Sequence, residues 1–223
     1  MGYKADFYRS ILRILINSVS FAGSGNYWDK RYQKGRDSGE GSYGELAFFK
    51  AKVLNEFVRD RGIRSVVEFG SGDGNQLKLA EYPAYTGVDV SPVAVRMARQ
   101  TFQQDGSKKF LTTEDYRGEI AELALSLDVV YHLVEDSVFE AYMERLFQSA
   151  TRFVAVYSSN CSGLMTDSPH VRHREFTRWV KERFPRLAPP RIIANSFPIG
   201  LRQQETSFAH FFFYQIDAEG GTR

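Results

Sequence analysis

The sequence has only one cysteine, Cys161, among its 223 residues. A single cysteine excludes an intramolecular disulfide and a zinc site built on paired cysteines. It is typical of proteins that fold in a reducing compartment. We therefore expect a cytoplasmic protein without a bound metal, in which Cys161 is an ordinary small residue that follows a strand.

Long uncharged apolar runs and an excess of one charge are also absent. The stretch Ile11–Ile16 is interrupted by Arg13, so we expect no membrane-spanning helix. The formal net charge is only +2, which gives no reason to expect nucleic acid as a partner. Apolar residues recur at helical spacing from Phe7 to Val19. This pattern predicts an amphipathic helix that packs on the domain, on a second subunit of a homodimer, or on a membrane surface; a short signal peptide is the alternative.

From residue 42 onward, apolar strands alternate with helical segments. Strands are predicted over 65–69, 85–90, 109–112, 122–130, 153–157, 191–197 and 208–216. Helices are predicted over 42–61, 74–80, 91–104, 138–147 and 174–184, with Ser42 and Ser91 as N-caps. This alternation indicates an α/β fold with a parallel sheet and helices on both of its faces.

The strongest functional signal is the segment Glu68–Gly74, which follows the first predicted strand. Its glycines have the spacing G-x-G-x-G, and they allow a tight turn and a close approach of the backbone to a ligand. The dinucleotide fingerprint is G-x-G-x-x-G, a different spacing. An acidic Glu68 before the loop suits a cationic ligand better than a phosphate.

Asp89 ends the second predicted strand, 21 positions after Glu68. An acidic residue at about this distance beyond a glycine loop typically accepts hydrogen bonds from ribose hydroxyls. The two acids and the loop together predict a nucleoside cofactor with a positive charge. An ordinary strand-to-helix turn is the alternative for the loop alone.

Roughly from Val66 to Tyr157, the sequence resembles the class I S-adenosylmethionine-dependent methyltransferases. Glu68–Gly74 is similar to the first motif of that family, and Gly87–Ser91 is similar to its second. The resemblance implies a Rossmann-like, doubly wound sheet of seven strands, mostly parallel with an antiparallel last strand, and S-adenosylmethionine as cofactor.

The same resemblance implies a division of the chain and a set of cofactor contacts. Residues 46–223 would be the S-adenosylmethionine-binding methyltransferase domain, preceded in residues 1–45 by an N-terminal helix and an aromatic, glycine-rich cap segment. Asp115 is chosen over Glu114 for the adenine amino group, with a solvated turn as the alternative. The cofactor site implied in this way consists of Glu68, Gly70, Ser71, Gly72, Gly74, Asp89, Val90, Asp115 and Leu127.

Transfer of a methyl group to a hydroxyl is helped by a general base. Asp128 and His132 follow the fourth predicted strand, and histidine titrates near neutrality; a packing or capping role is the alternative for His132. The acceptor is expected to be a small molecule or linked to a glycan, because Asp128–Tyr142 resembles bacterial methyltransferases thought to act on glycans. Oxygen is preferred over nitrogen or carbon as the methylated atom.

The acceptor is expected to meet the aromatic cap segment and the polar loop before the helix at 174–184. The histidines of that loop also form a weak metal-binding pattern with Asp167, and an exposed polar loop is the alternative. The predicted acceptor contacts are Tyr27, Trp28, Tyr43, His170, His173 and Arg174. Two other functions stay open, a nicotinamide-dependent Rossmann oxidoreductase and a non-catalytic S-adenosylmethionine-binding protein.

Overall fold

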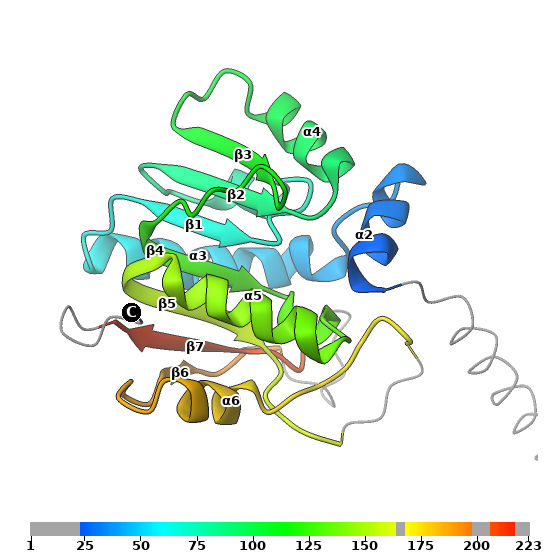
Figure 1. Ribbon diagram of the computed structural model, residues 1–223. Helices are drawn as coiled ribbons and strands as arrows, with labels where there is room; N and C mark the ends of the chain where they lie inside the picture. Colours follow the sequence, from blue (N-terminus) through cyan, green and yellow to red (C-terminus); the bar gives the residue numbers. More distant parts are fainter. Residues whose placement is uncertain (1–22, 164–167, 198–205, 217–223) are drawn as a thin grey trace, which may run out of the picture.

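The computed structural model describes residues 23–163, 168–197 and 206–216, and within them seven strands form one sheet in the order β3-β2-β1-β4-β5-β7-β6. β1 to β5 run parallel, whereas β7 is antiparallel to both β5 and β6, between which it lies (Figure 1). The predicted sheet, with its antiparallel last strand, is confirmed. The strands are β1 (Val66–Phe69), β2 (Tyr85–Asp89), β3 (Lys108–Thr112), β4 (Ala121–Leu127), β5 (Ala150–Ser158), β6 (Arg191–Ile193) and β7 (His210–Gln215).

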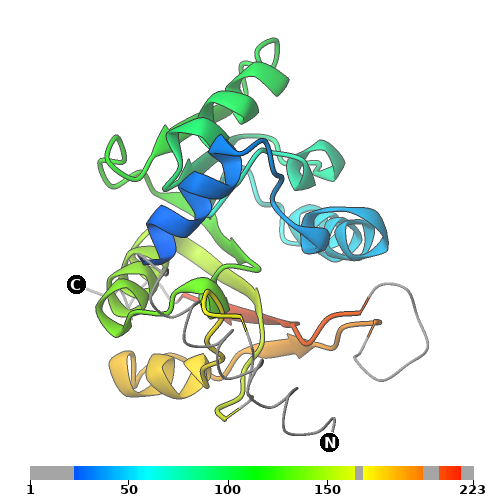
Figure 2. The same ribbon diagram turned by 90° about the vertical axis from the view of Figure 1, so that its right-hand side faces the viewer.

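Helices cover both faces of the sheet (Figures 1 and 2). Val66 packs in the core cluster of α3 and α4, whereas its neighbour Val67 packs in the cluster of α5 and α6. Successive side chains of a strand point to opposite faces, so the two valines at the start of β1 contribute to both cores. The covering helices are α3 (Gly44–Asp60), α4 (Pro92–Thr101), α5 (Asp136–Gln148) and α6 (Phe176–Arg183).

One further helix, α2 (Ser24–Gln33), lies beside the carboxyl ends of the parallel strands (Figures 1 and 2). The sequence predicts a loop over residues 22–26, and that prediction is wrong from Ser24 onward. The carboxylate of Glu135 accepts the backbone N–H of Ser24 at 2.9 Å and so supplies a cap from a distant segment. The helix predicted between Phe7 and Val19 lies outside the described residues.

Two predicted helix starts differ from the structure. The helix predicted over 74–80 is only the 3-10 turn η2 (Gln76–Leu79), because the preceding glycines have positive φ values that an α-helix does not accommodate. Ser42 belongs to the 3-10 turn η1 (Glu40–Ser42) and does not cap α3. Ser91 is confirmed as an N-cap, since its hydroxyl accepts the N–H of Ala94.

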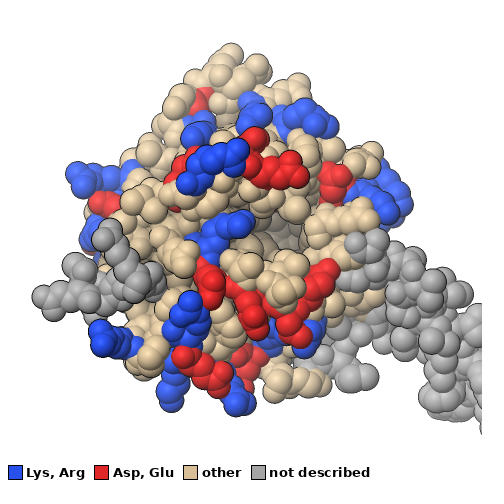
Figure 3. Space-filling view, viewed as in Figure 1, with Lys and Arg blue, Asp and Glu red and all other residues tan. Residues whose placement is uncertain are grey.

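No helix in the described ranges has both the length and the apolar character needed to cross a membrane. Acidic and basic side chains of these residues are interspersed over the face seen in Figure 3. This distribution agrees with the nearly balanced charge of the sequence.

Candidate functional site

A cavity of about 420 Å³ lies at the carboxyl ends of β1, β2 and β4 and is also lined by residues of α2. Ligands of open parallel sheets bind at this edge, and ligand pockets measure roughly 300–1,000 Å³. The cavity wall includes ten of the predicted site residues, namely Trp28, Glu68, Gly70, Ser71, Gly72, Asp89, Val90, Leu127, Asp128 and His132.

The glycine loop forms the part of this wall that follows β1. Gly70 and Gly72 have φ values of 82° and 57°, which glycine adopts without strain. A Cβ at Gly70 would overlap the side chain of Val129, and one at Gly72 would overlap the hydroxyl of Ser38. A side chain at either position would therefore be strained and would displace a neighbour, so glycine is favoured there and the loop backbone itself is presented to the cavity.

Asp89 fixes the glycine loop to the end of β2. Its carboxylate accepts the backbone N–H groups of Gly72 and Ser91, both at 2.8 Å. Burial raises the pKa of Asp89 to about 6, although these two donors act in the opposite direction. Each carboxylate oxygen still has a lone pair that can accept a further hydrogen bond.

Glu68 is buried at the floor of the cavity, where its carboxylate accepts a hydrogen bond of 2.7 Å from the hydroxyl of Tyr85. Burial raises its pKa to about 7. Two other buried polar atoms of the wall, Ser71 Oγ and Gln76 Oε1, have no hydrogen-bond partner within the described chain. Unpaired buried polar atoms are costly, so this wall suits a ligand that carries both a cation and hydrogen-bonding groups.

Asp128 follows β4 with a φ of 60°, a left-handed conformation that aspartate tolerates better than most residues. Its Oδ2 accepts a hydrogen bond of 2.6 Å from Lys50 Nζ, and its Oδ1 accepts one of 2.8 Å from the Tyr131 hydroxyl. Sequence reasoning missed Lys50. The available signal was a lysine midway between Leu46 and Leu54 on the buried face of α3.

His132 lies in the short η3 turn (Val130–His132), with its ring edge-on to Trp28 at 4.8 Å. Its Nδ1 is 3.0 Å from the carbonyl oxygen of His170. Because a carbonyl only accepts, Nδ1 carries the proton and Nε2 keeps its lone pair. Burial lowers the pKa of His132 to about 4, so the ring is neutral at pH 7.

Helix α2 is fastened to the starts of two helices that flank the cavity. The Ser24 hydroxyl donates to Glu135 at 2.6 Å, directly before α5. The hydroxyl of Ser91, the N-cap of α4, donates to Asp29 at 2.6 Å. These bonds hold the helix in place over the sheet edge.

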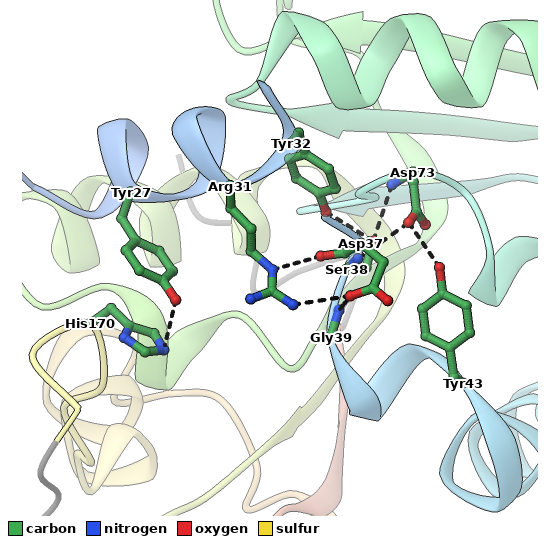
Figure 4. Close-up of polar contacts among 9 residues, drawn as sticks. All are labelled: Tyr27, Arg31, Tyr32, Asp37, Ser38, Gly39, Tyr43, Asp73 and His170. Carbon is green, nitrogen blue, oxygen red and sulfur yellow. Dashed lines mark hydrogen bonds and ion pairs between the residues drawn. The ribbon is translucent and has the colours of Figure 1, made fainter. Parts of the chain in front are cut away.

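The glycine-rich stretch after α2 is fastened to the loop after β1 (Figure 4). The carboxylate of Asp73 accepts the backbone N–H of Ser38 at 3.2 Å and the hydroxyl of Tyr43 at 3.1 Å. The Ser38 hydroxyl in turn lies 2.9 Å from the Tyr32 hydroxyl and accepts the N–H of Asp73. Together with α2, this stretch roofs the cavity, and we call residues 23–44 the roof.

The other predicted acceptor contacts are not in the cavity wall. The Tyr27 ring stacks on His170 at 4.1 Å. His173 Nδ1 lies 2.7 Å from the hydroxyl of Ser159. The guanidinium of Arg174 binds the Asp136 carboxylate and two backbone carbonyls, so it holds the loop together. Among the described residues no cluster of three His, Cys, Asp or Glu side chains could hold a metal, and Asp167 lies outside them.

Two predicted cofactor contacts are also not in the wall. Gly74 packs against the side chains of Phe102 and Ala98, where a Cβ would be 3.0 Å and 3.3 Å away. Asp115 is exposed, and its carboxylate accepts a hydrogen bond of 2.8 Å from the hydroxyl of Thr112. Thr113 is the residue of this segment that reaches the cavity.

No protein-family model and no curated protein matches this sequence. Solved structures of methyltransferases share its fold. Magnesium protoporphyrin IX methyltransferase from Synechocystis PCC 6803, solved with bound S-adenosylmethionine, is 14% identical and has a TM-score of 0.62, over 89% of this chain and 99% of that one. The N-methyltransferase NodS from Bradyrhizobium japonicum WM9, in complex with S-adenosylhomocysteine, is 14% identical with a TM-score of 0.60, over 76% and 86%.

The methyltransferase domain of bacterial CtHen1-CN is 20% identical, with a TM-score of 0.55, over 75% of this chain and 97% of that one. At such identities the likeness concerns the fold. This chain therefore has the Rossmann-like fold of the class I S-adenosylmethionine-dependent methyltransferases.

Proposed function

We propose that this protein is a cytoplasmic S-adenosylmethionine-dependent methyltransferase that methylates an oxygen of a small-molecule or glycan-linked acceptor. The observation that carries the proposal is the presence of two buried acids, Glu68 and Asp89, beside a glycine loop in one cavity. Neighbours of the same fold were solved with S-adenosylmethionine or S-adenosylhomocysteine, which supports the same choice of cofactor.

The polar atoms of the wall fit the parts of this cofactor. Glu68 offers a carboxylate to its cationic end, and Ser71 Oγ offers a hydrogen-bonding group to its methionine part. Asp89 has acceptor capacity left for the ribose hydroxyls. We assign the adenine to the side of Val90, and give Thr113 the place beside it in preference to Asp115. A dinucleotide would instead bring phosphates close to these two acids, which opposes the oxidoreductase alternative.

The cofactor supplies an electrophilic methyl group on a sulfonium, and the protein aligns the acceptor with it. For a hydroxyl acceptor, His132 is better suited than Asp128 to take the proton. Asp128 is held in an ion pair with Lys50, whereas His132 Nε2 has a lone pair with no partner among the described residues. The low pKa of His132 keeps this nitrogen unprotonated at neutral pH but also makes it a weak base.

The test combines ligand binding with methyl transfer. We expect S-adenosylhomocysteine to raise the melting temperature, because a ligand that binds only the folded state stabilises it. NAD and NADP should have no such effect. Asp89→Ala should abolish the shift, and Asp60→Ala, at an exposed position of α3, is the matched control. Stabilisation by NADP but not by S-adenosylhomocysteine would contradict the proposal.

The non-catalytic alternative is separated by a second measurement. Purified protein is incubated with S-adenosylmethionine labelled in its methyl group and with hydroxyl- and carboxyl-bearing acceptors. We expect label in the acceptor fraction and S-adenosylhomocysteine as the other product. Tight cofactor binding with no transfer to any acceptor would favour the non-catalytic alternative.

A further inference from the structure

Lys50 is the buried cation of the cavity wall. Lys50 is only 1% exposed, and it lines the cavity together with Asp128 and Gln76. A lysine ammonium has three donors, and here one of them binds Asp128 Oδ2 at 2.6 Å. The ammonium also lies 5.5 Å from the centre of the Tyr157 ring. Two of its N–H groups thus have no acceptor among the described residues.

The carboxylates near Lys50 do not provide acceptors for all three N–H groups of its ammonium. Asp128 is the only carboxylate that the described residues bring into an ion pair with it. Glu68 is close enough for Lys50 to lower its pKa, against the larger effect of burial. Burying an ammonium is costly unless its donors are satisfied, so the two spare donors at the cavity wall suit an oxygen of a bound ligand.

We propose that Lys50 is the binding site for a carboxylate of the acceptor, and that one oxygen of this carboxylate receives the methyl group. This inference rests on the proposed function and narrows its acceptor. The carboxylate oxygen forms the new bond to the methyl carbon, the carbon–sulfur bond breaks, and its electron pair stays on sulfur. The products are a methyl ester and S-adenosylhomocysteine.

A carboxylate acceptor agrees with the lack of a strong free base in the wall. An ionised oxygen has no proton to lose, so the reaction needs neither Asp128, which is paired with Lys50, nor His132, whose pKa burial lowers to about 4. The negative charge of the acceptor and the positive charge of the sulfonium disappear together. Lys50 serves to hold and orient the anion before that step.

The methionine part of the cofactor also ends in a carboxylate, so a carboxylate bound to Lys50 has two possible sources, the acceptor and the cofactor. Binding measurements separate the two sources. We compare S-adenosylhomocysteine with methylthioadenosine, which lacks the amino acid end. If Lys50→Gln leaves the affinities for both unchanged, Lys50 does not serve the cofactor. If it weakens only S-adenosylhomocysteine, the carboxylate belongs to the cofactor and the proposal is overturned.

Transfer is measured with paired probes and labelled S-adenosylmethionine. The acids are benzoate, hexanoate and glucuronate, and their partners are benzyl alcohol, hexanol and glucose. Methyl esters release labelled methanol in mild alkali, whereas methyl ethers do not. We expect alkali-labile label from at least one acid. Label found only in alkali-stable products, or no label from any acid while S-adenosylhomocysteine binds, overturns the proposal. Failure of wild-type protein to bind S-adenosylhomocysteine refutes the proposed function instead.

Variants of the ion pair distinguish acceptor binding from a structural role. Lys50→Gln leaves Asp128 unpaired and lowers stability, so the matched variant is Lys50→Gln with Asp128→Asn, which removes both charges. We expect at least a tenfold loss of kcat/KM for the acid in both, mostly as a higher KM, and partial recovery in Lys50→Arg. Recovery of wild-type kcat/KM in the double variant would mean that Lys50 only balances Asp128.

Discussion

Replacement of Gly72 by alanine tests whether the roof rests on the glycine loop. Gly72 and Gly35 both have positive φ values, 57° and 70°, but their surroundings differ. A Cβ at Gly35 meets nothing within 4 Å, whereas one at Gly72 overlaps Ser38 Oγ and comes within 2.8 Å of the Tyr32 hydroxyl. Gly35→Ala therefore measures the backbone strain alone, and Gly72→Ala adds the collision with the roof.

The magnitudes follow from the bonds at risk. Left-handed strain on alanine costs about 1 kcal/mol at either position. Gly72→Ala also displaces Ser38, which loses its contacts with the Tyr32 hydroxyl and with the N–H of Asp73, at about 1 kcal/mol each. We expect losses in free energy of unfolding of about 1 kcal/mol for Gly35→Ala and about 3 kcal/mol for Gly72→Ala. At about 2–4 °C per kcal/mol, the melting temperatures fall by about 2–4 °C and 6–12 °C.

Thermal unfolding of the two variants, followed by circular dichroism, gives this comparison directly. Ser38→Ala removes the hydroxyl that the new methyl group meets, so it should cost less in the Gly72→Ala background than in the wild type. In titrations with S-adenosylhomocysteine, Gly72→Ala should weaken binding, whereas Gly35→Ala should leave the affinity unchanged. Equal melting temperatures for the two glycine variants would refute the contact between the roof and the loop.

Three further predictions concern the acids around the cavity. Asp89→Asn should weaken S-adenosylhomocysteine binding by about 10–100-fold in calorimetry, the cost of a lost hydrogen bond to a charged group. Burial raises the pKa of Glu68 from 4.5 to about 7, so the folded state binds this proton more tightly than the unfolded state. The free energy of unfolding should therefore fall as pH rises through that range, and Glu68→Gln should flatten the slope in pH-dependent denaturant titrations. Glu135→Ala removes the cap of α2 at Ser24 and should speed amide hydrogen exchange in that helix severalfold, while unchanged exchange there would contradict its capping role.

The sheet and the part of the cavity wall around the glycine loop were predictable because their signals are local. Glu68, the glycine loop and Asp89 lie at the ends of two consecutive strands. The alternation of strands with helices predicts a parallel sheet, in which such ends meet at one edge. Lys50 is different, because it meets Asp128 across 78 positions of sequence. On its own helix it is one charged residue on an apolar face, and only the packing of α3 against the sheet gives it a partner.

The acceptor contacts were predicted from the rule that ligands of open parallel sheets bind at the carboxyl ends of the strands. This rule locates a segment of the chain but not the direction of its side chains. The backbone of His170 does reach His132 at the cavity, yet His173 turns to Ser159 and Arg174 turns to Asp136. The prediction of Asp115 as a cofactor contact missed the cavity by two residues for the same reason. A neighbouring hydroxyl engages its carboxylate, and Thr113 reaches the cavity.

The position of β7 has a consequence for how the chain is synthesised. This strand follows the other six strands of the sheet in sequence, so it leaves the ribosome after them, yet it lies inside the sheet, paired with β5 over Phe153–Ser158 and with β6 over Arg191–Ile193. Until it emerges, the outer edge of β5 is open and β6 has no partner. The strands that carry the glycine loop and Asp89 come from residues 66–127 and can pair much earlier. A nascent chain thus forms the floor of the cavity while the other half of its sheet still exposes an unpaired edge, the state in which chaperone contact and aggregation compete.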